Sequence, residues 1–144
     1  MIVTFTSSPS KSDVSAIYQG LVEFNREHFP APNENSFGLF IHDEEHRIVG
    51  GLTGQQFFTS MHIRYLWLDE SMRRQGFGRQ LIERVEAEAK QRDILNLFID
   101  TYSFQAPTFY ENLGFRQTGR YNDYPMRGID KIFYQKRLKP QRPR

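Results

Sequence analysis

One segment constrains the fold of this chain more than any other: a Gly-Phe-Gly turn between an apolar stretch and a long amphipathic one. His62–Leu68 (HIRYLWL) is aromatic and apolar and predicts a β-strand. After the turn, apolar residues recur at helical spacing: Phe77, Leu81, Ile82, Val85 and Ala89. This periodicity predicts a helix over Gly76–Gln91. A strand that leads through a glycine turn into a helix is typical of a sheet with helices packed on it.

Gly76 and Gly78 lie where the predicted helix begins. The first turn of a helix has unpaired N–H groups and the positive end of the helix dipole, so it attracts anions such as phosphate. Arg73, Arg74 and Arg79 add positive charge at the same point. The sequence therefore predicts an anion site here. A tight strand-to-helix turn is the alternative explanation of the two glycines.

Two well-known phosphate-binding motifs are excluded at this turn. No Gly-Lys-Ser/Thr follows the glycines, as a P-loop would require. The dinucleotide fingerprint G-x-G-x-x-G also fails, because position 81 is Leu. The predicted anion site therefore belongs to another class.

The remaining patterns predict an α/β fold: an α+β mixed, mostly antiparallel central sheet flanked by helices. We expect further strands at Met1–Thr6, Phe37–His42, Ile48–Gln56, Leu95–Thr101, Phe115–Thr118 and Lys131–Arg137. A first helix is expected from the Ser/Pro turn at 7–12 to about Phe29, where Pro30 and Pro32 stop it. A short helix is expected from Pro107 to a C-terminal cap at Gly114.

Composition limits the classes of function. The 144 residues suit one domain, which we place at 1–138, followed by a basic tail at 139–144. Positive charge is concentrated at this end of the chain, so nucleic acid is not an expected partner. The chain has no cysteine, which excludes thiolate metal sites and a Cys nucleophile. No apolar run reaches about 18–20 residues and no signal-peptide pattern is present, so we expect a cytoplasmic protein with no membrane partner.

Two motifs then point to a family. Arg73-x-x-Gly76-x-Gly78 resembles the Arg/Gln-x-x-Gly-x-Gly/Ala signature of the GNAT superfamily of N-acetyltransferases. Ala106–Phe115 (APTFYENLGF) is similar to the A-x-x-x-Y-x-x-x-G-F segment of the same family. A helix and a strand separate the two motifs, as in that family. The resemblance implies the GNAT fold and an acetyltransferase that uses acetyl-CoA as acetyl donor and no metal.

The resemblance also implies a set of cofactor-binding residues. The strand before the loop would pair through its backbone with the pantetheine arm, and the N–H groups of the loop would bind the pyrophosphate. The matching residues are Leu66, Trp67, Leu68, Arg73, Arg74, Gln75, Gly76, Phe77, Gly78 and Arg79. Ser103 stands at the position of a family Asn that contacts the cofactor, with Gln105 as a second candidate for this contact. Phe109, in the second motif, is a further expected cofactor-binding residue.

Catalytic residues are implied in the same way. Tyr110 matches the family tyrosine that acts as general acid toward the departing coenzyme A thiolate. His62 and Asp100 are the candidates for the base that removes the amine proton, and water is the alternative. The implied reaction is direct transfer of the acetyl group to a primary amine, by a monomer or a homodimer. A non-catalytic acyl-CoA-binding module on the same fold is the alternative.

The acceptor amine is the least specified part of the prediction. The family draws its acceptor pocket from the first helix and from the connection that leads into the last strand. The matching polar residues here are Glu23, Asn25, His28, Tyr121, Asp123 and Tyr124. Their mixed chemistry does not identify the acceptor.

Overall fold

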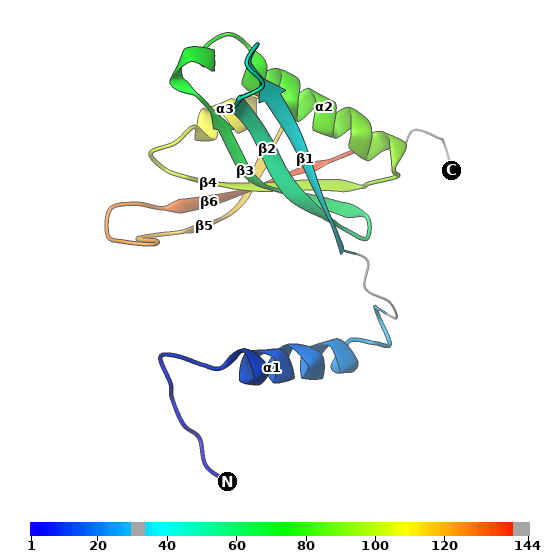
Figure 1. Ribbon diagram of the computed structural model, residues 1–144, viewed down its shortest axis with the longest axis vertical. Coiled ribbons are helices and arrows are strands. Elements are labelled where there is room, and N and C mark those ends of the chain that lie inside the picture. The colour runs from blue at the N-terminus through cyan, green and yellow to red at the C-terminus, as the bar shows by residue number, and fades with distance from the viewer. Residues whose placement is uncertain (30–33, 140–144) are drawn as a thin grey trace. The chain divides into compact units, whose positions relative to one another are not determined.

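The computed structural model describes residues 1–29 and 34–139, which belong to two compact units, Met1–Pro32 and Asn33–Arg144. Figure 1 shows the helix and strands of each unit. The prediction of a single domain over 1–138 stays a prediction. Most of the predicted basic tail, and the prolines expected to end the first helix, lie outside the described residues.

The N-terminal unit contains one helix, α1 (Lys11–Phe24). The Ser10 side chain accepts a hydrogen bond from the Asp13 backbone at 3.1 Å, which is an N-cap of the expected kind. The helix ends five residues before the predicted Phe29, because the backbone after Phe24 tightens into turns, with Arg26 N–H bonded to Glu23 O at 3.3 Å. The predicted strand Met1–Thr6 is wrong, since these residues have no ladder partner and form no strand.

The C-terminal unit is built on a six-stranded sheet in the order β1-β2-β3-β4-β6-β5. Its strands are β1 (Glu34–His42), β2 (Ile48–Phe57), β3 (Ser60–Leu68), β4 (Asn96–Tyr102), β5 (Arg116–Tyr121) and β6 (Lys131–Arg137). Every neighbouring pair is antiparallel except β3 and β4. The mixed, mostly antiparallel sheet predicted from the sequence is therefore confirmed.

Two helices, α2 (Phe77–Gln91) and α3 (Pro107–Asn112), lie on the same face of the sheet (Figure 1). The apolar stripe of α2 is buried there against residues of the sheet such as Leu52, Ile63 and Leu97. Lys136 on β6 connects this layer: its Nζ donates to Glu86 Oε2 of α2 and to Leu113 O at the end of α3, both at 2.8 Å. Lys136 thereby links both helices to β6.

The pairing of β3 with β4 is short, and this determines where a site can form. The parallel register covers only Ser60–Ile63 with Asn96–Ile99. Beyond the Ile63–Ile99 pair the two strands separate. The edge of β3 after Ile63 therefore faces a space between the strands, close to the beginnings of α2 and α3.

Within residues 1–29 and 34–139, no helix has the length and hydrophobicity that a membrane span requires. Across the same residues, no three His, Asp or Glu side chains form a group that could hold a metal ion.

Candidate active site

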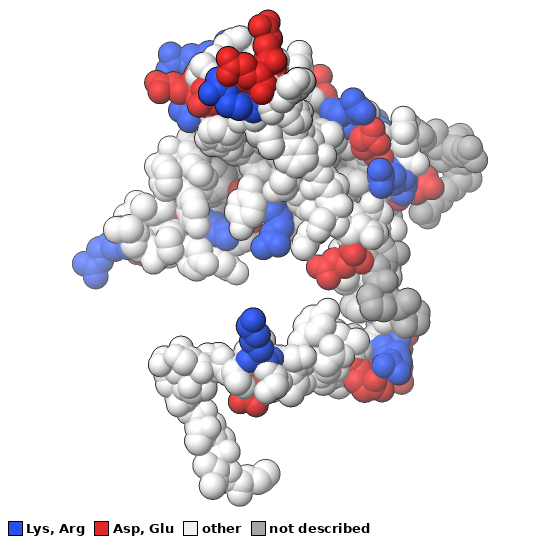
Figure 2. Space-filling view, in the orientation of Figure 1, with Lys and Arg blue, Asp and Glu red and all other residues white. Residues whose placement is uncertain are grey.

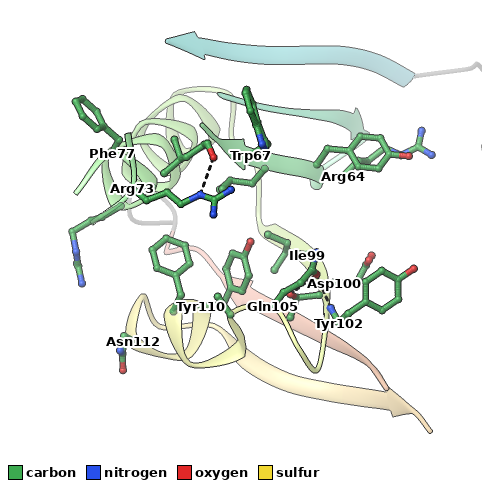
Figure 3. A pocket seen from close by; sticks show the side chains of 18 of the residues that line it. Arg64, Trp67, Arg73, Phe77, Ile99, Asp100, Tyr102, Gln105, Tyr110 and Asn112 are labelled. Atoms are coloured by element: carbon green, nitrogen blue, oxygen red, sulfur yellow. Dashed lines mark hydrogen bonds between the residues drawn. The ribbon is translucent and has the colours of Figure 1, made fainter. Parts of the chain in front are cut away.

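A cleft of about 1180 Å³ occupies the space between the diverging strands (Figure 3). Its walls come from the second half of β3, the loop and first turn of α2, the end of β4, and α3 with the turn before it. Lys131 on β6 closes one side. Segments that are far apart in the sequence thus contribute to one elongated site.

The wall formed by β3 presents backbone as well as side chains. All residues from Arg64 to Leu68 line the cleft, and on the other side residues 65–68 pair with β2. The register with β2 shifts between Thr53 and Gly54, which leaves Arg64 as an extra residue on β3. Because β4 has left the ladder here, the outer edge of β3 is available for pairing with an extended ligand.

At one end of the cleft, the loop enters α2 through Gly76, which has a left-handed conformation with φ of 85°. The first helical hydrogen bond runs from Gln80 N–H to Gly76 O, at 3.1 Å. The N–H groups of Phe77, Gly78 and Arg79 therefore have no acceptor within the helix and point out of its first turn. This is the arrangement that binds phosphate at a helix start.

Gly78 has a different reason to be glycine. A Cβ at this position would lie 3.1 Å from Cζ of Phe109, which packs from α3 and lines the cleft. Gly78 thus allows the second motif to approach the first. Gly76 therefore shapes the turn, as one of the two explanations from the sequence has it, and the anion site at this turn stays a prediction.

Three arginines surround the same end of the cleft. Arg73 donates from Nε to Leu68 O at 3.1 Å, so its guanidinium is held against the end of β3. Arg79 lies 3.5 Å from Glu83 in an exposed pair, and Arg74 lines the cleft from the loop. Charged side chains of both signs gather over this end of the sheet (Figure 2). An anionic ligand here would meet guanidinium groups and helix N–H groups together.

Tyr110 lies on α3 and points into the middle of the cleft (Figure 3). The residue is only 7% exposed, and its ring packs edge-on against Phe109 and Phe115. Burial, with a smaller contribution from the charge of Asp100, raises the pKa of the Tyr110 phenol to about 12. The hydroxyl is therefore a hydrogen-bond donor at any physiological pH.

His62 and Asp100 meet on neighbouring strands at the other end of the cleft. His62 Nε2 lies 3.3 Å from Asp100 Oδ2, and Lys131 Nζ lies 3.5 Å from Asp100 Oδ1. The His62 hydrogen bond and the Lys131 charge hold the pKa of Asp100 below its usual value, against the opposing effect of partial burial. An ionised Asp100 favours the tautomer of His62 with the proton on Nε2, which leaves the Nδ1 lone pair free.

The structure does not bring Ser103 to the cleft. Its backbone N–H donates to Asp130 O at 2.8 Å, and its Oγ accepts from Asp130 N–H at 3.0 Å. Ser103 is therefore engaged with the turn before β6. Gln105, the second candidate for the same contact, does line the cleft. Its Oε1 accepts from Thr101 Oγ1 at 2.9 Å and from Tyr102 N–H at 2.8 Å, which fixes the orientation of the amide.

The other predicted site residues can now be placed. Those that line the cleft are His62, Leu66, Trp67, Leu68, Arg73, Arg74, Gly76, Phe77, Gly78, Arg79, Asp100, Phe109 and Tyr110. Gln75 is in the loop but not in this lining, and its side chain donates to Ser71 O at 2.7 Å. Sequence reasoning missed Thr101, Tyr102 and Lys131. Lys131 reaches the site only because β6 pairs with β4, which no local pattern indicates.

Comparisons with known proteins agree with this geometry. An acetyltransferase from Bacillus cereus ATCC 14579 has a solved structure that matches with a TM-score of 0.84 and 32% identity, covering 94% of this chain and 98% of that one. Fold and cleft thus have the form found in the GNAT class of acetyltransferases. The family model of the Acetyltransferase (GNAT) domain matches residues 8–138, so the chain belongs to the GNAT family.

Two further acetyltransferases are similar in sequence. The blasticidin-S acetyltransferase of Streptomyces morookaense is 36% identical over 83 residues, which are 57% of this chain and 61% of that protein. The acetyltransferase Atu2258 of Agrobacterium fabrum is 30% identical over 104 residues, which are 72% of this chain and 76% of that protein. The first match thus spans less than two thirds of the relative's length.

Proposed function

We propose that this protein transfers the acetyl group of acetyl-CoA to the amine of an acceptor, without a covalent enzyme intermediate. One observation carries the proposal: a single cleft joins a helix start with free N–H groups, an unpaired strand edge and a buried phenol, in that order. An extended donor with phosphates at one end, amides in the middle and a thioester at the other fits this sequence of groups.

The residues present suit each part of acetyl-CoA. The N–H groups of Phe77, Gly78 and Arg79, together with Arg73 and Arg74, would hold the phosphates. The edge of β3 at 66–68 would pair with the amide groups of the pantetheine arm. An acetyl-CoA molecule bound along this path would have its thioester near Tyr110. The thioester supplies the activated acetyl group.

The chemistry requires one bond to form and one to break. The amine nitrogen bonds to the acetyl carbon, the carbon–sulfur bond breaks, and the sulfur keeps its electron pair. Tyr110 donates its hydrogen bond to this sulfur, as general acid. His62 accepts the proton that the amine nitrogen loses, with Asp100 holding the imidazole. The released thiolate takes up one proton and His62 gives up one when the site opens to water, so the products are an amide and a free thiol.

A thiol-release assay tests this function. Purified protein and acetyl-CoA are incubated with a panel of amines that includes amino acids, diamines, peptides and blasticidin S, and free coenzyme A is measured. We expect acceptor-dependent thiol release that His62→Gln and Asp100→Asn each lower. Glu44→Gln, which neutralises an exposed acid in the turn between β1 and β2, outside the cleft, should leave the release unchanged. Binding of acetyl-CoA with no release for any acceptor would instead favour a non-catalytic acyl-CoA-binding module.

A further inference from the structure

The charges that line the cleft are strongly unbalanced. Among the described residues, the lining contains one carboxylate, Asp100, and five basic side chains: Arg64, Arg73, Arg74, Arg79 and Lys131. With His62 neutral, the net formal charge is +4. Arg73 and Arg74, in the loop before α2, and Arg79, in its first turn, lie at the phosphate end. Arg64 and Lys131 remain at the opposite end, where the acceptor must approach Tyr110, and there they outnumber the carboxylate.

Asp100 is already neutralised by the protein's own cation. One carboxylate oxygen meets His62 and the other meets Lys131 Nζ at 3.5 Å. The side chains of Asp100 and Lys131 are only 25% and 23% exposed, so bulk water screens this pair less than a surface pair. A second ammonium brought by the acceptor would have to compete with Lys131 for the same oxygens.

Lys131 also contacts the aromatic rings near Asp100. Lys131 Nζ lies 5.9, 5.3 and 5.7 Å from the ring centroids of Tyr102, Tyr124 and Phe133. Rings and a carboxylate around one point are the usual recognition elements for an ammonium. Here the chain fills this ammonium site with Lys131. Cationic acceptors therefore gain little from it.

We propose that the acceptor is an amine that also carries a carboxylate, such as an amino acid, and that Lys131 selects it over diamines and polyamines. This inference rests on the proposed function. The acceptor's carboxylate would lie toward Lys131 and Arg64, and its amine toward Tyr110. The positive surroundings also favour the uncharged, nucleophilic form of the amine.

Matched acceptor pairs test this selection: tyrosine with tyramine, lysine with cadaverine, and ornithine with putrescine. The two members of a pair differ by the carboxylate. In thiol-release assays at low salt we expect the carboxylated member to have the higher kcat/KM, by roughly tenfold, which corresponds to one partly screened charge contact. The preference should shrink as salt is added.

Variants at position 131 make the test specific. In Lys131→Met, Asp100 and the three rings become available to a substrate ammonium, so the ratio of lysine to cadaverine turnover should fall by about tenfold or more. Lys131→Arg should retain the preference. Lys90→Met, which removes a cation from α2 outside the cleft, should leave both turnover and the ratio as in the wild type.

Failure of the inference differs from failure of the function. If the decarboxylated amines are the better substrates of the wild type, or if Lys131→Met leaves the ratios unchanged, the selection by Lys131 is wrong and the transferase remains. If no acceptor of any class releases thiol although acetyl-CoA binds, the proposed function itself fails and the inference with it.

Discussion

At the scale of single residues, the proposed role of Tyr110 is the most specific. A phenol with a pKa of about 12 is a weaker acid than an ordinary thiol, whose pKa is about 8.5. Complete transfer of the Tyr110 proton to the thiolate therefore costs free energy as long as the site is closed to water. A hydrogen bond from a buried phenol to a developing sulfur anion carries no such cost and strengthens as charge develops.

Replacement of Tyr110 tests this role. Tyr110→Phe keeps the ring that packs on Phe109 and Phe115 and removes the hydroxyl. We expect kcat to fall by roughly 10²-fold, with much less change in the dissociation constant for acetyl-CoA. Steady-state kinetics and calorimetry measure the two quantities. Tyr18→Phe, at a tyrosine of α1 that is 57% exposed, is the control, and equal kinetics for Tyr110→Phe and wild type would contradict the role.

The same residue gives a pH prediction for stability. The unfolded chain loses the tyrosine proton near pH 10, whereas the folded protein retains the Tyr110 proton until about pH 12. Between these values the folded state binds more protons, so its stability falls as pH rises. Urea unfolding at pH 9 and pH 11.5 should show a larger loss for wild type than for Tyr110→Phe, by about 1–2 kcal/mol. An identical loss would show that Tyr110 ionises normally.

Gly78 offers a test of how closely the two motifs approach. A Cβ in Gly78→Ala would press on Phe109, whose ring must shift within the cleft. We expect the fold to persist and the affinity for acetyl-CoA to fall by roughly tenfold, in line with modest overpacking. Gly119→Ala is the matched control, since an added Cβ there has no atom within 4 Å among the described residues. Unchanged affinity in Gly78→Ala would mean that Phe109 moves freely.

At the scale of elements, Lys136 holds helices and sheet together. Its ammonium, with the side chain 23% exposed, donates to Glu86 and to the Leu113 carbonyl at 2.8 Å each. Lys136→Met should lower the free energy of unfolding by about 1.5–3 kcal/mol, because two charge-assisted hydrogen bonds are lost. Lys90→Met removes a longer and more exposed partner of Glu86 and should cost at most about 0.5 kcal/mol. Similar losses in urea unfolding would contradict this difference.

The elements that the sequence predicted well have strong local patterns. The helix expected at Gly76–Gln91 spans Phe77–Gln91, and the last strand has the predicted bounds Lys131–Arg137. The prediction of a strand at Met1–Thr6 failed because alternation over six residues does not specify a partner strand. The loop and Tyr110 were accessible through motifs. The divergence of β3 and β4 after Ile63–Ile99 was not, since it depends on pairing between distant segments.

At the scale of the whole molecule, the distribution of charge matters more than its sum. The chain has a formal net charge of +2, yet the described lining of the cleft alone carries +4. Positive charge is therefore concentrated where an anionic donor would bind, and it is compensated by acids elsewhere. Such a concentration attracts polyanions such as acetyl-CoA and makes their binding sensitive to salt.

Calorimetric titration of the protein with acetyl-CoA tests the central claim most directly. We expect one molecule bound per chain with a dissociation constant of roughly 1–100 µM, the range in which many enzymes bind their substrates. Affinity should weaken with added salt and in Arg74→Glu, which reverses a charge at the phosphate end. Absence of binding at acetyl-CoA concentrations up to about 1 mM would contradict the account, because neither the helix start nor the β3 edge would then have its ligand.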